Sequence, residues 1–65
     1  MHGPTHFITK VRFFLRLQHA TITDLAYALQ ISRQAIYWKI NNHSWSLQDV
    51  YDIARILKVD PKDLV

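Results

Sequence analysis

Two signals for the start of a helix, Thr21 and Ser32, lie close together and constrain the fold of this chain more than any other feature. Thr21 followed by Asp24 has the spacing of a capping box, which predicts a helix over residues 22–29. Ser32 is a favourable N-cap for a second helix over residues 33–41. Because only a tight turn fits between them, the two helices must cross steeply. The sequence therefore predicts a helix-turn-helix here.

The segment before this motif also shows helical periodicity. A helix is predicted from about Thr5 to Gln18, and its apolar stripe comprises Phe7, Ile8, Val11, Phe14, Leu15 and Gln18. Phe13 and Leu17 fall outside that stripe, where they either cover the edge of the core or form a contact with a second copy.

The segment after the motif opens with a second capping box, Ser46 with Asp49. The helix that follows is expected to bury Leu47, Val50, Ala54 and Leu57, together with Tyr51 and Ile53. Trp45 is expected to close the core in front of this helix. Asp60 as an N-cap and Pro61 at the first helical position signal a fifth helix, either a short closing turn or the beginning of a longer helix.

The composition favours a small all-α domain. The 65 residues suffice for one domain, near the lower size at which a single core folds unaided. One glycine and two prolines leave little loop, and the absence of cysteine excludes a disulfide or a thiolate-bound metal. We therefore predict a compact bundle of four to five helices over residues 7–65, with the helix-turn-helix over 21–42 and a flexible leader over 1–6. His2 and His6 in that leader are expected to be solvated, and no metal site is expected.

Charge is unevenly distributed along the chain. Lysines and arginines outnumber acidic residues by eight to five, giving a formal net charge of +3. Five of the eight cations precede residue 40, whereas four of the five acids lie at Asp49 or beyond. A basic first part is typical of a face that binds phosphates.

Several classes of function find no support in the sequence. No apolar run approaches the roughly 20 residues of a membrane span, so the protein is expected to be soluble and cytoplasmic. No nucleophile–base pair, Gly-rich phosphate loop or paired carboxylate suggests catalysis, so we expect neither an enzyme nor a cofactor. A steeply crossed helix pair is instead the arrangement that places the second helix in a DNA major groove while the first braces it.

Two stretches of the chain read ITDLAYALQISRQAIYWKINN and SLQDVYDIARILKVDPKDL. In this order they resemble the helix-turn-helix core and the following helix of lambda-repressor-like (Cro/repressor-type) DNA-binding domains, and the form of the core is closest to small phage and prophage repressors. The resemblance implies a transcriptional repressor that binds double-stranded operator DNA as a homodimer, at the nucleoid of a bacterial host.

Three positions depart from the usual pattern of that class. Gln30 stands where the turn usually has glycine, so its backbone is expected to be left-handed at a cost of about 1 kcal/mol. Ile22 stands where a glutamine often holds a phosphate, so the threonines beside it would have to make that contact. Asn42 stands where glycine often follows the recognition helix. Residues 41–43 are expected to end that helix, because asparagine tolerates the left-handed conformation.

The second helix of the motif is expected to contact the bases. Because Ile36 and Ile40 face inward, four side chains point largely outward: Arg33, Gln34, Tyr37 and Trp38. Arginine suits guanine and glutamine suits adenine, and each bidentate contact discriminates by about 1–3 kcal/mol. Tyr37 could contact a thymine methyl or a phosphate. Trp38 has three alternatives: a DNA-backbone contact, an anchor for a protein partner, or core packing over the following helix.

Phosphate contacts are expected from polar residues that flank this helix. They are Thr21, Thr23, Ser32, Lys39, Asn41, Asn42 and His43. For Lys39, simple exposure to solvent is an equal alternative. His19, where the first helix ends, fits a favourable helix C-terminus better than catalysis.

A rival interpretation is that the same fold binds a protein, as an antirepressor or an antitoxin-like regulator does. It rests on Ile22, Tyr37 and Trp38, which stand where a DNA-binding surface would be expected to carry polar residues. DNA binding predicts a steep salt dependence and sensitivity to Arg33→Ala, whereas partner binding predicts sensitivity to Trp38→Ala.

Overall fold

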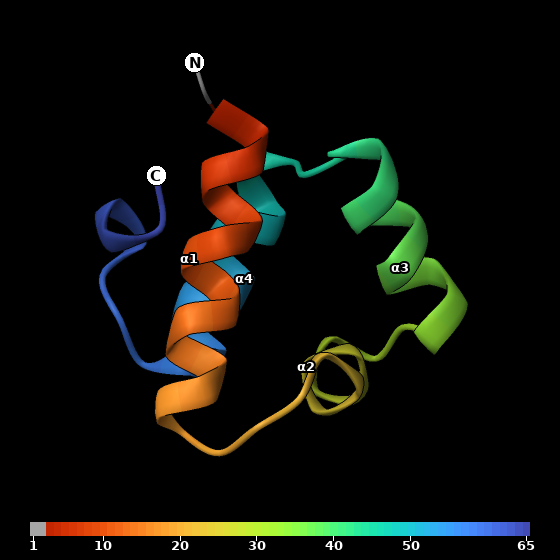
Figure 1. The fold of residues 1–65 in the computed structure, drawn as a ribbon, viewed down its shortest axis with the longest axis horizontal. Helices are drawn as coiled ribbons and strands as arrows, with labels where there is room; N and C mark the ends of the chain where they lie inside the picture. Colours follow the sequence, from red (N-terminus) through yellow and green to blue (C-terminus); the bar gives the residue numbers. More distant parts are fainter. Residues whose placement is uncertain (1–2) are drawn as a thin grey trace.

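The computed structural model describes residues 3–65, with side chains described from residue 7 onward. It contains α1 (Gly3–Leu17), α2 (Ile22–Leu29), α3 (Arg33–Asn42), α4 (Leu47–Leu57) and the 3-10 turn η1 (Pro61–Asp63). Helices α1 and α4 pack side by side, α2 lies across one end of this pair, and α3 and η1 lie on opposite sides of it (Figure 1). The described residues form no strand, and the predicted all-α fold is confirmed.

The helices of the motif begin with the caps that the sequence predicts. Thr21 Oγ1 accepts a hydrogen bond from the Asp24 N–H at 3.1 Å, and Asp24 Oδ2 accepts one from the Thr21 N–H at 2.9 Å. Ser32 Oγ accepts one from the Ala35 N–H at 3.0 Å. Helix α4 opens with the same reciprocal box as α2. These bonds satisfy N–H groups that have no partner inside a helix, which is why each helix starts where it does.

The core receives one apolar stripe from each helix. Its buried residues are Phe7, Ile8, Val11 and Leu15 of α1, Ile22, Leu25 and Ala26 of α2, Ile36 and Ile40 of α3, Ile53, Ala54 and Leu57 of α4, and Leu64 after η1. Trp45 packs against this core, with its ring centroid 5.1 Å from that of Phe7. Phe14 and Leu29, both expected inside, are only half-buried. Gln18 is exposed, but its Nε2 donates to the Leu57 carbonyl at 2.6 Å and ties the end of α1 to the end of α4.

Two residues that were expected in the core lie outside it. Leu47 is 68% exposed and Tyr51 is 49% exposed. The buried stripe of α4 passes through Ile53, Ala54 and Leu57, and a rotation of about 100° per residue places Leu47 and Tyr51 to one side of it. The prediction was wrong because α4 offers two overlapping apolar stripes, and only packing against the other helices selects between them.

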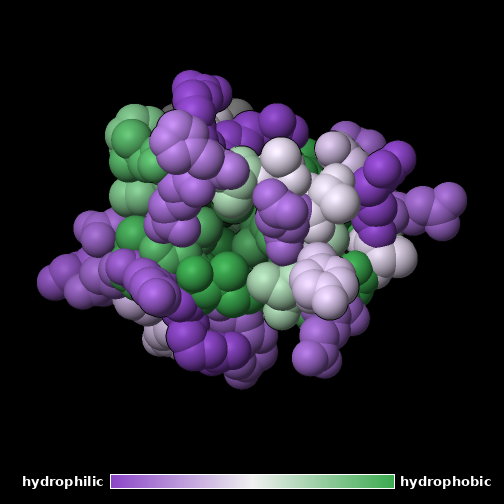
Figure 2. All heavy atoms as spheres, turned by 90° about the horizontal axis from the view of Figure 1, so that it is seen from below, coloured by the Kyte–Doolittle hydropathy of each residue, from purple (hydrophilic) through white to green (hydrophobic). Residues whose placement is uncertain are grey.

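Apolar side chains also reach the surface elsewhere. Seen from the side on which α2 lies, they gather at the centre of the face and polar side chains surround them (Figure 2). A chain of this length buries a smaller fraction of its surface than a larger domain does. Exposed apolar groups are therefore expected here and do not by themselves indicate a binding site.

Left-handed residues end the helices. Gln30 has φ 62° and ψ 38°, as expected from its place in the turn. At the end of α3 the left-handed residue is His43, with φ 50°, whereas Asn42 is still helical. The helix thus runs one residue further than predicted, and in its last turn the Asn42 side chain donates from Nδ2 to the Trp38 carbonyl at 2.8 Å.

The first helix starts earlier than the sequence predicts, and a short turn follows the last helix. Helix α1 begins at Gly3, inside the segment expected to be a leader, and its first turn tolerates Pro4 because the first N–H groups of a helix lack partners anyway. Residues 1–2, including His2, and the side chain of His6 lie outside the described part. The fifth element is the 3-10 turn η1, capped by Asp60, and Leu64 after it lies in the core.

The left-handed turn residue yields a stability prediction. Gln30→Gly should raise the free energy of unfolding by about 1 kcal/mol, because glycine adopts this conformation without a Cβ clash. For a domain of this size that corresponds to a rise in Tm of about 4–8 °C in thermal unfolding followed by circular dichroism. Ala28→Gly, on the exposed side of helical α2, is the matched control and should lower Tm instead. An unchanged or lower Tm for Gln30→Gly would contradict the argument.

Candidate nucleic-acid interface

The outward side of α3 brings together the side chains predicted to contact bases. They are Arg33, Gln34, Tyr37 and Trp38. Ile36 and Ile40 are buried on the opposite side of the helix, which packs on α2. Residues four apart lie above one another on a helix, so Tyr37 follows Arg33 and Trp38 follows Gln34 in one exposed strip. We call these four residues the α3 strip.

The position of Trp38 excludes one of its three alternatives. Its side chain is 58% exposed, and that of Tyr37 beside it is 42% exposed. An indole folded over α4 as part of the core would be largely covered. The core alternative was therefore wrong, and both aromatic rings are exposed on the outer side of α3.

The residues predicted to contact phosphates lie at the starts of α2 and α3 and along α3 to its end. Thr21, Thr23 and Ser32 are exposed at the starts of α2 and α3, and Asn41, Asn42 and His43 are exposed at the end of α3. The Thr21 and Ser32 oxygens serve as acceptors in the helix caps, so both hydroxyls can still donate to a phosphate. Asn42 commits one of its two amide N–H groups to the Trp38 carbonyl and retains the other.

Lys39 differs from the other predicted phosphate contacts. Its Nζ lies 3.1 Å from Asp49 Oδ2, which also accepts a hydrogen bond from the Ser46 N–H at 3.0 Å. One carboxylate therefore joins α3 to the start of α4. Partial burial alone would raise the pKa of Asp49, but the bonds from Ser46 and the Lys39 ammonium outweigh it and lower the pKa. Simple solvent exposure of Lys39 was thus wrong, since its first role is to hold α3 in place.

Two arginines outside the predicted interface lie next to it. Arg12 and Arg16, both exposed and one turn apart on α1, line a pocket with Ala20 and Ile22 at the start of α2. Neither was predicted from the sequence to contact DNA. Their i, i+4 spacing was the available signal, but only the packing of α1 shows what lies beside them.

Metal binding and membrane insertion find no counterpart in the described residues. They contain no group of three or more His, Asp or Glu side chains that could hold a metal ion. None of their helices combines the length and the apolar character needed to cross a bilayer.

His19 is the left-handed residue that ends α1, and its N–H bonds to the Arg16 carbonyl at 3.1 Å.

Residues 10–65 match the protein family described as the Cro/C1-type HTH DNA-binding domain. The matched range includes α2, α3, α4 and η1, and therefore the whole predicted interface. No curated protein and no solved structure gives a significant match to the chain.

The junction between α3 and α4 predicts how stability changes with pH. Because the pKa of Asp49 is lowered on folding, its contribution is present above the unfolded value of about 3.9 and is lost as the pH falls through the folded value. Asp49→Asn should therefore be less stable than wild type by about 1 kcal/mol at pH 7, because the cap and the ion pair are both weakened. The difference in urea unfolding should shrink below about pH 4. A difference that stays constant down to about pH 2 would show that packing, not charge, is responsible.

Proposed function

This chain belongs to the Cro/C1-type family of helix-turn-helix DNA-binding domains, and we propose that it is a sequence-specific transcriptional repressor of the phage or prophage type. In this proposal α3 lies in the major groove of an operator and α2 braces it across the backbone. The supporting observation is the α3 strip, whose side chains point away from the core and are not needed to form it. Bound at a promoter, the domain would block access to it.

The first turn of α3 is proposed to select the bases. Arg33 and Gln34 lie there, and the N-terminal part of a recognition helix is the part that reaches base edges. Arg33 can donate two hydrogen bonds to O6 and N7 of a guanine, and Gln34 can bond to N6 and N7 of an adenine. Tyr37 and Trp38, one turn further on, would contact thymine methyl groups or the sugar–phosphate backbone.

The polar groups at both ends of the strip are proposed to fix its register on the duplex. Hydroxyl and amide donors at the starts of α2 and α3 and at the end of α3 can bind phosphates on either side of the groove. Such contacts carry no sequence information themselves. They would hold the first turn of α3 against the same base pairs each time.

Two copies are proposed to bind one operator. A single short helix contacts few base pairs, and helix-turn-helix dimers bind half-sites about one turn, roughly 34 Å, apart. Phe13 and Leu17 of α1 are exposed and are one candidate contact between copies.

Binding to a protein partner is the second candidate. The observation in its favour is the exposure of Tyr37 and Trp38, because aromatic anchors dominate many protein–protein interfaces. In that case the α3 strip would fill a groove on the partner, and Trp38 rather than Arg33 would carry most of the affinity.

Selection from a pool of random duplexes at near-physiological salt tests the proposal directly. An enriched inverted repeat would support a dimeric reader of a specific operator and would give the half-site spacing. Retention that falls with salt, without any enriched sequence, would contradict the proposed sequence-specific repressor.

A substitution in the α3 strip tests whether Arg33 contacts a base. Arg33→Ala should weaken binding to the selected site by about tenfold or more and relax the preference at one base pair, because alanine cannot make the bidentate bond to guanine. Lys62→Ala on η1, on the opposite side of the molecule from α3, changes charge equally and should leave affinity near wild type (Figure 1). Fluorescence anisotropy with a labelled duplex measures both. Equal weakening by the two substitutions would mean that only net charge matters.

A further inference from the structure

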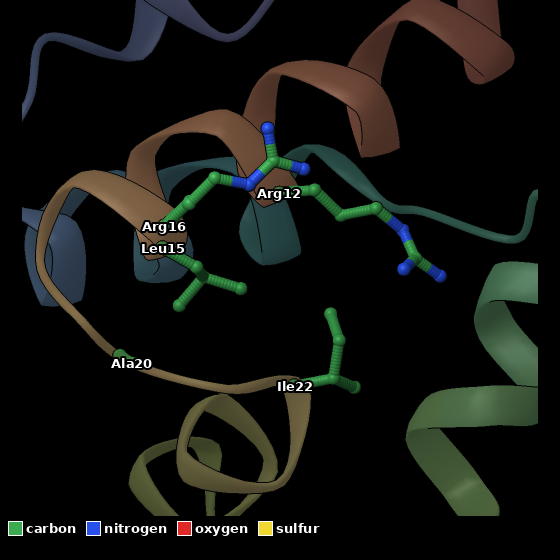
Figure 3. Close-up of a pocket in the computed structure, with 5 residues that line it drawn as sticks. All are labelled: Arg12, Leu15, Arg16, Ala20 and Ile22. Carbon is green, nitrogen blue, oxygen red and sulfur yellow. The ribbon is translucent and has the colours of Figure 1, made fainter.

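A pocket of about 230 Å³ lies between the second half of α1 and the start of α2. Leu15 and Ile22 point toward each other across it, and Arg12 and Arg16 extend along its upper edge (Figure 3). The Arg12 side chain is directed toward the side on which α3 lies (Figure 3). The pocket thus combines an apolar floor with a rim of two guanidinium groups.

These two arginines lack the partners that three other cations of the domain have. Lys39 and Arg55 form ion pairs with aspartates, and Lys10 Nζ donates to the Val65 carbonyl oxygen at 2.7 Å. No carboxylate of the described residues pairs with Arg12 or Arg16, and no acid lines their pocket. Like charges at i, i+4 destabilise a helix, so folding alone gives no reason to hold the two together.

The surroundings favour an anion at this place. A hollow with charges of one sign and walls of low dielectric concentrates the electric field and attracts counter-ions. Leu15 and Ile22 are buried and provide such walls. Guanidinium groups match the oxygens of a phosphate with two parallel hydrogen bonds, which an ammonium cannot do.

We propose that Arg12 and Arg16 form a binding site for a phosphate group of the DNA backbone, outside the segment that the α3 strip contacts. The site extends the proposed DNA-binding function and rests on it. Two of its lining residues, Ala20 and Ile22, flank Thr21, which is itself a candidate phosphate contact at the same helix start. A strand that reaches Thr21 therefore passes beside the pocket, and the two arginines lengthen the line of phosphates bound along α2.

The salt dependence of DNA binding measures the number of phosphates that the protein neutralises. The probe is a labelled duplex that carries the site enriched from the random pool, titrated at several potassium chloride concentrations. Arg12→Gln combined with Arg16→Gln should reduce the slope of log affinity against log salt by about 0.9 for each phosphate that is no longer bound. Binding should weaken, while the preferred bases stay the same. Lys58→Gln with Lys62→Gln removes the same charge near η1 and is the matched control.

The outcomes separate this site from the proposed function. If wild-type protein selects an operator but the double arginine variant leaves the slope unchanged, the site is overturned and the repressor proposal stands. An equal decrease of slope in the double lysine control would attribute the effect to net charge and would also overturn it. If the wild-type protein binds no duplex, the proposed function fails and the site fails with it.

A second probe distinguishes backbone phosphate from free phosphate. Inorganic phosphate is titrated at low ionic strength while the amide resonances of Ala20 and Ile22 are followed by NMR. Saturable shifts that vanish in the double arginine variant, together with an unchanged DNA slope, would assign the pocket to a free anion and overturn the proposal. Arg12→Lys with Arg16→Lys retains charge and fold, and it should bind the duplex more weakly than wild type.

Discussion

The turn of residues 30–32 fixes the direction in which the α3 strip points, and the rest of the interface depends on it. The N–H groups of Gln30 and Ile31 bond to the Tyr27 and Ala26 carbonyls at 3.0 Å, so α2 ends within a single left-handed residue. Only Ile31 separates this residue from Ser32, which caps α3. A residue inserted in this turn would shift the start of α3 relative to α2 and disturb the burial of Ile36. The direction of the α3 strip is therefore set by a backbone conformation to which none of its four side chains contributes.

Ion pairing within the domain decides which cations remain for a polyanion. Aspartates lie mainly on α4 and η1, and the two on α4 pair with Lys39 and Arg55. Arg33 at the start of α3, like Arg12 and Arg16 on α1, has no such partner among the described residues. The domain thus has a basic side around the starts of α2 and α3 and a mixed side around α4. This asymmetry orients a DNA-binding domain during approach, before any base is contacted.

Helix starts were predictable from the sequence because a cap joins residues only three positions apart, as in Thr21 and Asp24. The inward spacing of Ile36 and Ile40 also predicted that Arg33 is exposed. For Trp38 it left packing in the core open as an alternative. What could not be predicted depends on contacts between distant segments. Packing against the other helices determines which face of α4 is buried, and it leaves Leu47 exposed. The pocket beside Arg12 exists only because α1 packs over the start of α2, a relation that no local pattern encodes.

The attachment of α3 to the rest of the domain separates binding from folding. The helix packs chiefly on α2 through Ile36 and Ile40, and its far end is tied to α4 by Lys39 and Asp49. The side chains of the α3 strip add little to this attachment, so they are free to vary with the sequence that is read. A partner that engages both the strip and the start of α2 bridges the two helices and stabilises their crossing, because it binds the folded arrangement alone.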